Sequence, residues 1–258
     1  MAPRALYALT FGKKPVAPIN HFYMRPDAPT DMFTQFYFWC IMDDVNGPVL
    51  VDQGCTDSCL EEMGIPVRLK YHPLELLSRI GVDPGDVRHV ILTHLHWDHY
   101  AGDAFYPNAT YYVHRKEVEY MTGPLMRFRT YSQHYNFKAM EKLLQLQFAG
   151  RVKQLEGERE TVLEGVEALR TGGHTPGLVS VAVHADDGTR VICGDVIPRW
   201  QNVTETVPCG IHHDVTEALR AIELVRDETG CLEHILPGHD SAITERFREE
   251  PPGVYRIF

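Results

Sequence analysis

A dense run of metal-binding residue types is the feature that most constrains this chain. His94, His96, Asp98 and His99 fall within six residues, directly after the apolar segment 88–93, which is predicted to be a buried strand. Alternation along an extended chain places the first three on one side. Helical spacing instead puts His96 and His99 on a shared face. A strand that breaks into a helix here would present all four side chains around one point.

The chemistry of these side chains predicts a metal site. Neutral imidazole is the commonest metal ligand near pH 7, and a carboxylate added to imidazoles suits zinc, iron or manganese. Several polar groups beside an apolar strand are costly to bury without a compensating partner, and a cation supplies one.

Three distant residues are suited to complete such a site. His174 lies in a glycine-rich Gly-Gly-His-Thr-Pro-Gly turn, Asp195 ends an apolar Val-Ile-Cys-Gly-Asp stretch, and His239 follows Leu-Pro-Gly. Each stands at the end of a predicted strand or in a turn beside one, where loops carry binding and catalytic groups. A catalytic zinc takes about four ligands with one position open, so these residues and the run at 94–99 suffice for two metal ions.

The rest of the chain alternates short apolar runs with turn signals and helical patterns, which predicts two packed sheets with helices outside, in a single domain over 1–258. A strand that turns into a helix is predicted at 110–115, and the Asp-Asp-Gly at 186–188 predicts a hairpin. Asp214 and Gly230 are predicted to begin and end a helix. Strands are predicted over 47–54, 88–93, 178–184, 189–193 and 233–237, and a further helix over 73–80.

An aromatic-rich segment at about 121–151 lacks strand alternation and is interpreted as a helical insertion. It either packs its aromatics as a cap or lines a substrate site. A second aromatic stretch at 33–39 is interpreted as a core strand, with a wall facing a substrate chain as the alternative.

Composition excludes some classes of function. The net charge of −10 argues against a nucleic-acid binder, and no apolar run is long enough to predict a membrane span. No secretory signal is recognised at the start, and the six scattered cysteines are typical of reduced thiols, so a cytoplasmic location is expected. A small-molecule substrate is the expected partner, and the aromatic-rich N-terminal region is compatible with a homodimer.

The combined motif resembles the metallo-β-lactamase superfamily, from about residue 49 to 240. The resemblance implies a four-layer αβ/βα sandwich with two metal ions at the shared edge, zinc first, with manganese, cobalt or iron as alternatives. It also implies that Asp52, in an Asp-Gln-Gly turn, supports the site from behind. The resemblance implies that the first metal is held by His94, His96 and His174, the second by Asp98, His99 and His239, and both by Asp195.

Within that superfamily, the layout is most similar to the N-acyl-homoserine lactonases and related lactonases. This similarity implies a hydrolase that opens a lactone ring by attack of a metal-bridging hydroxide, with Asp98 orienting it or moving a proton. Such lactonases often carry a tyrosine three residues after the bridging aspartate, whereas this chain has Pro198 there. A substitute donor or substrate contact is therefore expected among Tyr100, Tyr131, His134, Trp200, His212 and His213.

Other functions remain open from the sequence. A thioester hydrolase of the glyoxalase II type has the same cage but usually adds a basic C-terminal region, whereas Glu249 and Glu250 lie among the 19 residues after His239. Another ester or amide hydrolase, an iron-dependent redox enzyme, a nuclease and a non-catalytic metal-binding module are further alternatives. Trp97 is expected to pack beneath the site. The remaining histidines are interpreted as surface, strand or cap residues: His21, His72, His89, His114, His184 and His234.

Overall fold

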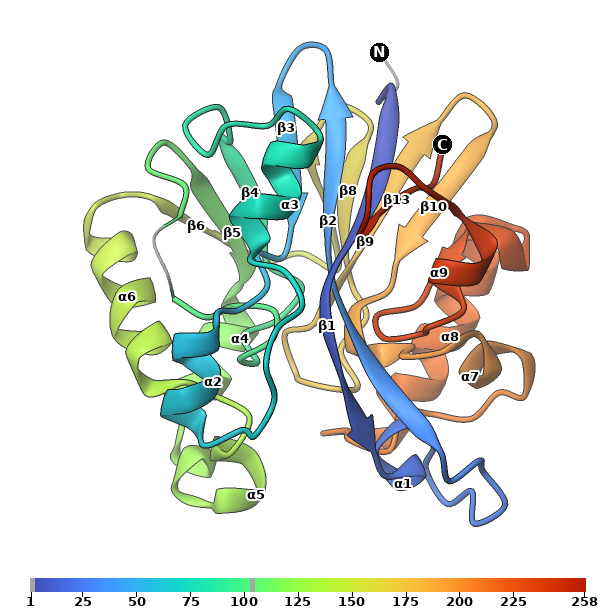
Figure 1. The fold of residues 1–258 in the computed structure, drawn as a ribbon. Coiled ribbons are helices and arrows are strands. Elements are labelled where there is room, and N and C mark those ends of the chain that lie inside the picture. The colour runs from blue at the N-terminus through green and yellow to red at the C-terminus, as the bar shows by residue number, and fades with distance from the viewer. Residues whose placement is uncertain (1–2, 103–104) are drawn as a thin grey trace.

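The structure, a computed structural model, describes residues 3–102 and 105–258 and contains two β-sheets that pack face to face (Figure 1). The eight-stranded sheet has the order β12-β13-β1-β2-β3-β4-β5-β6, and the five-stranded sheet has the order β11-β10-β9-β8-β7. The strands are β1 (Ala5–Val16), β2 (Met32–Asp43), β3 (Gly47–Val51), β4 (His89–Ile91), β5 (Thr110–His114), β6 (Val152–Leu155), β7 (Arg159–Leu163), β8 (Val166–Arg170), β9 (Val179–Ala185), β10 (Gly188–Ile192), β11 (Ile235–Leu236), β12 (Arg248–Glu249) and β13 (Val254–Arg256).

Helices cover the outer face of each sheet, with α2, α3, α4 and α6 on one side and α7, α8 and α9 on the other (Figure 1). The predicted four-layer αβ/βα sandwich is therefore confirmed. The α-helices are α1 (Pro18–His21), α2 (Asp57–Met63), α3 (Pro73–Arg79), α4 (Arg115–Met121), α5 (Arg129–Ser132), α6 (Phe137–Phe148), α7 (Trp200–Thr204), α8 (Val215–Thr229) and α9 (Ile243–Arg246). Short 3₁₀ turns are η1 (Pro124–Arg127), η2 (Gly194–Val196) and η3 (Leu232–His234).

Strand β2 shows why the layers form, because both of its faces are apolar. Tyr37 and Trp39 lie in the core shared with the five-stranded sheet, while Phe36 and Phe38 lie in the core beneath α2, α3 and α6. Alternate side chains of a strand point to opposite faces, so an unbroken aromatic run needs a layer on each side. The core-strand interpretation of 33–39 is confirmed for most of this stretch, although Phe33 is exposed.

The predicted elements form with small shifts at their ends. The Asp214 side chain accepts hydrogen bonds from the backbone N–H groups of Thr216 and Glu217, and Gly230 ends α8 in the left-handed conformation. The strand predicted over 233–237 is wrong in its first half, where a 3₁₀ turn replaces it. Only two residues of β11 pair with β10, and Pro237 cannot donate to a ladder.

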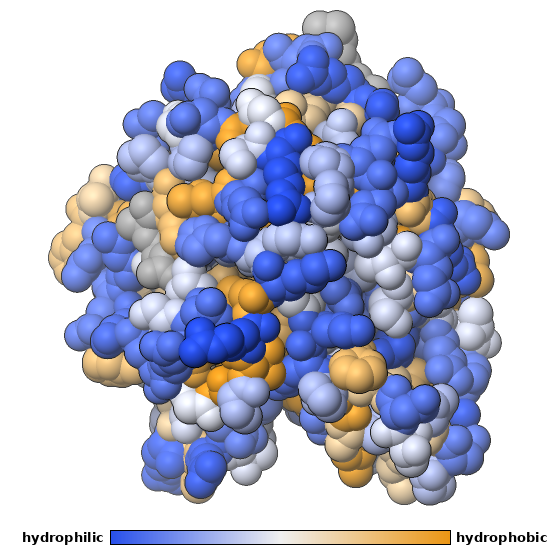
Figure 2. Space-filling view, in the orientation of Figure 1, coloured by the Kyte–Doolittle hydropathy of each residue, from blue (hydrophilic) through white to orange (hydrophobic). Residues whose placement is uncertain are grey.

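Residues 121–151 contain η1, α5 and α6, and they divide between two environments. Ala139, Leu143 and Leu146 bury one face of α6 against the sheet, while Phe137 and Phe148 on the same helix are exposed. The part around α5 lies opposite α1, and the space-filling view is hollowed at its lower edge between these two regions (Figure 2). Within the described residues, no helix has both the length and the apolar character needed to cross a membrane.

Candidate metal centre

The run of ligands after β4 turns sharply instead of entering a helix. The backbone N–H groups of His99 and Tyr100 both donate to the carbonyl oxygen of His96, at 3.0 and 2.9 Å. These bonds close one helical turn, and the chain then continues as a loop. The predicted helix after the strand is thus wrong in its length, because only one helical turn forms. One turn is nevertheless enough to bring His99 round to the face that carries His94 and His96.

The distant ligand candidates arrive from strand ends and glycine-rich turns. His174 lies before β9, Asp195 lies in η2 after β10, and His239 follows β11. Gly173 adopts a φ of +77°, and a Cβ atom there would lie 2.7 Å from the Cα of Ala218. The turn before β9 therefore needs glycine both for its left-handed backbone and for its close contact with α8.

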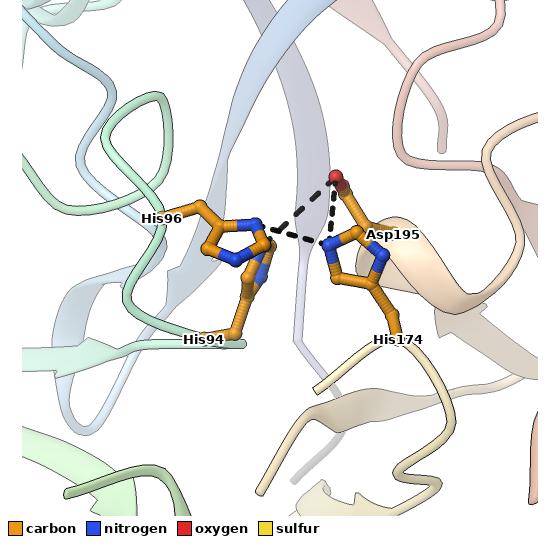
Figure 3. A group of neighbouring side chains, drawn as sticks. All are labelled: His94, His96, His174 and Asp195. Atoms are coloured by element: carbon orange, nitrogen blue, oxygen red, sulfur yellow. Dashed lines mark hydrogen bonds and ion pairs between the residues drawn. The ribbon is translucent and has the colours of Figure 1, made fainter. Parts of the chain in front are cut away.

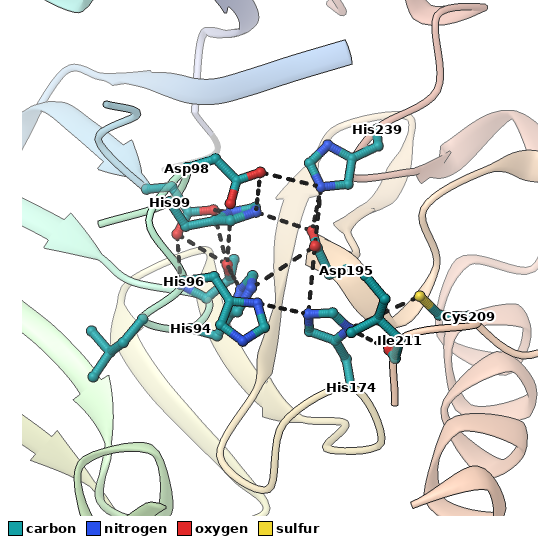
Figure 4. Close-up of polar contacts among 12 residues, drawn as sticks. His94, His96, Asp98, His99, His174, Asp195, Cys209, Ile211 and His239 are labelled. Atoms are coloured by element: carbon teal, nitrogen blue, oxygen red, sulfur yellow. Dashed lines mark hydrogen bonds and ion pairs between the residues drawn. The ribbon is translucent and has the colours of Figure 1, made fainter. Parts of the chain in front are cut away.

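The seven candidate ligands converge as two buried groups. Within each group, one ligand atom from every residue lies within 4.8 Å of the others. This division is the one that the family resemblance implies, and it brings together segments as far apart as β4 and β11 (Figures 3 and 4). The first group is His94, His96, His174 and Asp195, and the second is Asp98, His99 and His239.

Asp195 lies between the two groups and directs its oxygens to both. Its Oδ1 atom is 3.0 Å from the Nε2 atoms of His99 and His239, in the second group. Its Oδ2 atom is also 3.0 Å from Nε2 of His239, and it lies 3.5 Å from Nε2 of His174 and 3.9 Å from Nε2 of His94, in the first group. Figure 4 shows this carboxylate in the middle of the cluster. Such a position suits a ligand that two cations share.

In two of the ligand histidines, a hydrogen bond on the far side of the ring fixes which nitrogen faces inward. The Nδ1 atom of His174 donates to the carbonyl oxygen of Ile211 at 2.6 Å, and that of His239 donates to the carbonyl oxygen of Gln35 at 2.8 Å. A proton held on Nδ1 leaves the lone pair of Nε2 pointing into the cluster, as a metal ligand requires.

Asp52 holds His99 in the same way. The Oδ2 atom of Asp52 lies 2.7 Å from Nδ1 of His99, and its Oδ1 atom accepts a hydrogen bond of 2.7 Å from the backbone N–H of Thr93. Asp52 adopts a φ of 63°, an uncommon left-handed conformation that aims its side chain back under the ligand run. The supporting role that the resemblance implies for Asp52 matches this geometry.

Several inward-facing atoms lack an aligned hydrogen-bond partner among the described residues. Three such buried atoms are Nε2 of His94, Nε2 of His99 and Oδ1 of Asp195. Buried polar atoms without such a partner are costly. The donor set of imidazole nitrogens and carboxylate oxygens fits a pair of divalent cations, which would satisfy these atoms.

Burial lowers the pKa values of some ligand imidazoles, whereas neighbouring carboxylates raise the pKa of another. Burial lowers the pKa of His174 to about 4 and holds the pKa values of His94 and His96 well below 6.5. Burial also acts to lower the pKa of His99, but the neighbouring carboxylates, with Asp195 the strongest, outweigh it and raise that pKa well above 6.5. The first group is therefore already in the neutral form that binds metals.

Two adjoining cavities open over the cluster. The smaller, of about 100 Å³, is lined by residues of both ligand groups together with Lys14, His21 and Trp97. The larger, of about 400 Å³, extends toward α5 and is lined mainly by tyrosine, histidine and other polar side chains. Both cavities share Asn20, His96, His134, His174 and Ile211, so they form one cleft.

Four of the six predicted substrate contacts line this cleft. His134 lines both cavities, and its ring centroid lies 5.0 Å from that of His96. Tyr131, His212 and His213 line the larger cavity.

The other two predicted contacts, Tyr100 and Trp200, belong to the core. Tyr100 is buried against Tyr111, because the turn that carries His99 inward rotates the next residue away. Trp200 begins α7, and its indole N–H donates to the carbonyl oxygen of Leu232 at 3.2 Å. Neither residue lines either cavity, so the structure places both outside the cleft.

His21 and Lys14 line the cleft but were not among the predicted site residues. The ring of His21 is stacked on that of His239 at 6.0 Å, and its Nδ1 accepts a hydrogen bond of 2.8 Å from Arg199. Burial, followed by the charges of His239 and Arg199, lowers the pKa of His21 to about 2. No ligand spacing surrounds either residue in the sequence, so no local signal could have revealed them.

Trp97 lies beside the cluster, as expected from the sequence, with its ring edge-to-face against Phe36 at 5.4 Å. Four of the histidines that are interpreted as surface, strand or cap residues occupy strand or cap positions. His72 and His114 accept the first backbone N–H bonds of α3 and α4, and His89 and His184 bond to Tyr112 and Glu167.

Comparison with known families identifies the group to which this site belongs. The family model described as the metallo-beta-lactamase superfamily matches residues 39–239, well over half of the chain. The chain belongs to this superfamily. The match contains all seven candidate ligands and Asp52, and it leaves the first strand outside.

Curated relatives of this superfamily member include N-acyl homoserine lactonases. One from a Bacillus species is 29% identical over 185 residues, covering 66% of this chain and 68% of the relative. The lactonase AttM of Rhizobium radiobacter is 26% identical over 227 residues, covering 83% of this chain and 74% of the relative.

Solved structures of the superfamily share the fold. One is an N-acyl homoserine lactone hydrolase with the product N-hexanoyl-L-homoserine bound at the catalytic metal center. It superposes with a TM-score of 0.77 at 23% identity, covering 96% of this chain and 98% of the other. AidC, described as a dizinc quorum-quenching lactonase, gives a TM-score of 0.71 at 14% identity, covering 98% and 90%.

Proposed function

We propose that this protein is a dinuclear metal-dependent hydrolase that opens the ring of a lactone. The observation that carries the proposal is the pair of buried ligand groups at the floor of a cleft, joined by the carboxylate of Asp195. The relatives named above are N-acyl homoserine lactonases, which favours a lactone over other esters.

In this proposal His94, His96 and His174 hold one cation, and Asp98, His99 and His239 hold the other, with Asp195 between them. Zinc is the proposed metal, since a set of imidazoles with carboxylates at closely spaced positions suits it. Manganese, cobalt and iron can use similar donor sets, so elemental analysis of the purified protein decides the identity.

When bound, divalent cations would lower the pKa of a water molecule to near 7 and would polarise the carbonyl group that is attacked. The residues of the chain position the reacting groups and transfer the proton. The Oδ2 atom of Asp98 lies 3.7 Å from Nε2 of His239, and Asp98 lines the smaller cavity. From there it can take a proton from the attacking water and deliver it to the ring oxygen that leaves. The net reaction adds one water and gives a hydroxy acid.

His134 is the proposed replacement for the tyrosine that Pro198 displaces. His134 lines both cavities and packs beside His96, and Pro198 lines the smaller cavity with it. An imidazole N–H at this junction can donate to an oxygen of the substrate, which a proline cannot do. His134→Ala should therefore lower kcat more strongly than it raises KM.

The proposal is tested by following acid release from a panel of γ- and δ-lactones with the metal-loaded protein. Rapid opening of at least one lactone is expected, together with loss of turnover in Asp98→Asn. Thioesters serve as the competing substrates, because a glyoxalase II type enzyme uses the same cage. If the metal-loaded protein cleaves thioesters and leaves every lactone intact, the lactone assignment fails. Turnover that depends on iron and oxygen would instead indicate redox chemistry.

A further inference from the structure

Lys14 is brought to the metal cleft by the geometry of the long β1–β2 pair. Lys14 pairs with Thr34 in the antiparallel register, and both side chains line the smaller cavity, as does Val16 two residues further along. Residues two apart on a strand, and directly paired residues on its neighbour, share one face. The inner face of this ribbon therefore forms a wall of the cleft, with Lys14 as its charged member.

Within the part of the chain that the structure describes, the ammonium group of Lys14 has no acidic partner. Its Nζ atom lies over the ring of Trp97, 5.2 Å from the centroid. Among residues 3–102 and 105–258, no carboxylate is recorded within the 4.0 Å ion-pair distance of this atom, whereas lysines elsewhere, such as Lys138 with Glu62, form such pairs. The Trp97 ring holds the ammonium group beside the cavity and leaves its donors available.

The other groups around the cavity do not compete for this charge. The two carboxylates that line the same cavity are Asp98 and Asp195. Both belong to the ligand groups, where bound cations would take up their charge. With metals in place, Lys14 is left as an uncompensated cation facing the substrate.

We propose that Lys14 binds an anionic group, such as a carboxylate, on the substrate, so that the preferred lactone carries a negative charge besides its ring. This inference rests on the proposed function and makes it more specific. The chain carries a net charge of −10, but charges more than about 10 Å apart are largely screened at physiological ionic strength, so an anion in the cleft responds mainly to the nearby cation. A half-buried lysine at the cleft wall then determines which substrates stay bound.

The larger cavity accommodates the remainder of such a substrate. Its walls carry Tyr120, Tyr131, Tyr135, His212 and His213, which offer aromatic faces and hydrogen-bonding groups more than aliphatic surface. A long, purely aliphatic acyl chain matches this lining poorly, whereas a short polar or aromatic portion matches it well.

The test compares substrates that differ only in charge. N-succinyl-homoserine lactone and 5-oxotetrahydrofuran-3-carboxylate are each measured against their neutral carboxamides, which have nearly the same shape. In the metal-loaded wild type, at least one carboxylated member is expected to have the higher kcat/KM. Lys14→Met should reduce that advantage by roughly 10- to 150-fold, the range for loss of a hydrogen bond to a charged group, mainly through KM. The readout is the ratio of kcat/KM for each carboxylate to kcat/KM for its carboxamide.

Lys13→Met is the matched control. Lys13 is the adjacent residue on the opposite face of β1, where its ammonium group lies over the exposed ring of Phe33 at 4.6 Å. It carries the same charge but lies outside the cleft. Its loss should leave the ratio of kcat/KM between the carboxylate and the carboxamide unchanged. Lys14→Glu should reverse the preference and favour the neutral member. Inhibition by the ring-opened N-succinyl-homoserine should weaken in parallel, which gives a binding measurement independent of turnover.

The outcomes separate the two proposals. If neutral lactones are opened but Lys14→Met changes neither the charge preference nor the inhibition, the role of Lys14 is refuted and the lactonase assignment stands. If Lys13→Met has the same effect as Lys14→Met, the general charge of the surface is responsible and the inference is also refuted. If no lactone in any panel is opened, both proposals fail together.

Discussion

Replacing Asp52 by Asn should weaken the binding of one metal ion and spare the other. Asp52 bonds to Nδ1 of His99 at 2.7 Å and to the backbone N–H of Thr93 at 2.7 Å. Asn keeps the shape and tolerates the φ of 63°. Its carbonyl oxygen can still accept from Thr93, which turns its NH₂ group toward His99. The imidazole must then accept on Nδ1 and carry its proton on Nε2, where a metal should bind.

The size of the effect follows from the bond that is lost. A hydrogen bond to a charged group contributes about 1.5–3 kcal/mol. Its loss corresponds to an increase of the dissociation constant by about 10- to 150-fold. This range agrees with the roughly 10- to 100-fold losses typical when a partner behind a ligating histidine is removed. The loss should fall on the cation held by Asp98, His99 and His239. The site of His94, His96 and His174 should change by less than about threefold, because its rings are held by other groups.

Isothermal titration of the metal-free protein with Zn²⁺, supported by elemental analysis after dialysis, measures both sites. Asp43→Asn is the matched control, since Asp43 is also a buried aspartate that accepts backbone N–H bonds, from Val45 and Asn46 in the β2–β3 hairpin. It should bind two metals like the wild type. Equal weakening of both sites by Asp52→Asn, or no weakening at all, would refute the reasoning.

Two further predictions follow from buried groups near the centre. Glu117 is fully buried and accepts hydrogen bonds from the backbone N–H of Leu95 and the hydroxyl of Tyr135. Glu117→Ala should lower the free energy of unfolding by about 2–4 kcal/mol, because it leaves these donors unsatisfied. Glu117→Gln should lower it less, because the amide oxygen can still accept hydrogen bonds. Equal decreases for the two variants, measured by urea unfolding, would contradict this. For pH, the pKa of His174 is lowered from 6.5 to about 4, so between these values the unfolded chain binds a proton that the folded chain excludes. The stability of the metal-free protein should thus fall as the pH drops from 6.5 toward 4, by up to about 1.4 kcal/mol per pH unit for each such histidine; a flat profile in chemical denaturation would count against buried neutral imidazoles.

The sequence by itself determined the layers and the ligand types. The aromatic run in β2 predicted a strand, and its alternation explains burial on both faces. The spacing from His94 to His99 required the chain to turn between these residues if all four ligands were to face one point. A single helical turn at His96 brings them together. These features depend on local backbone geometry, where neighbours a few residues apart decide the outcome.

Tertiary structure decided which side chains face the substrate. Tyr100 follows a ligand directly and Trp200 lies five residues after another, yet both are packed into the core. Lys14 and His21 have no signal in their own segment, and they reach the cleft because β1 pairs with β2 and α1 docks beside Arg199. A cleft wall is formed by segments far apart in the chain, so its composition depends on how whole layers dock, which local periodicity does not encode.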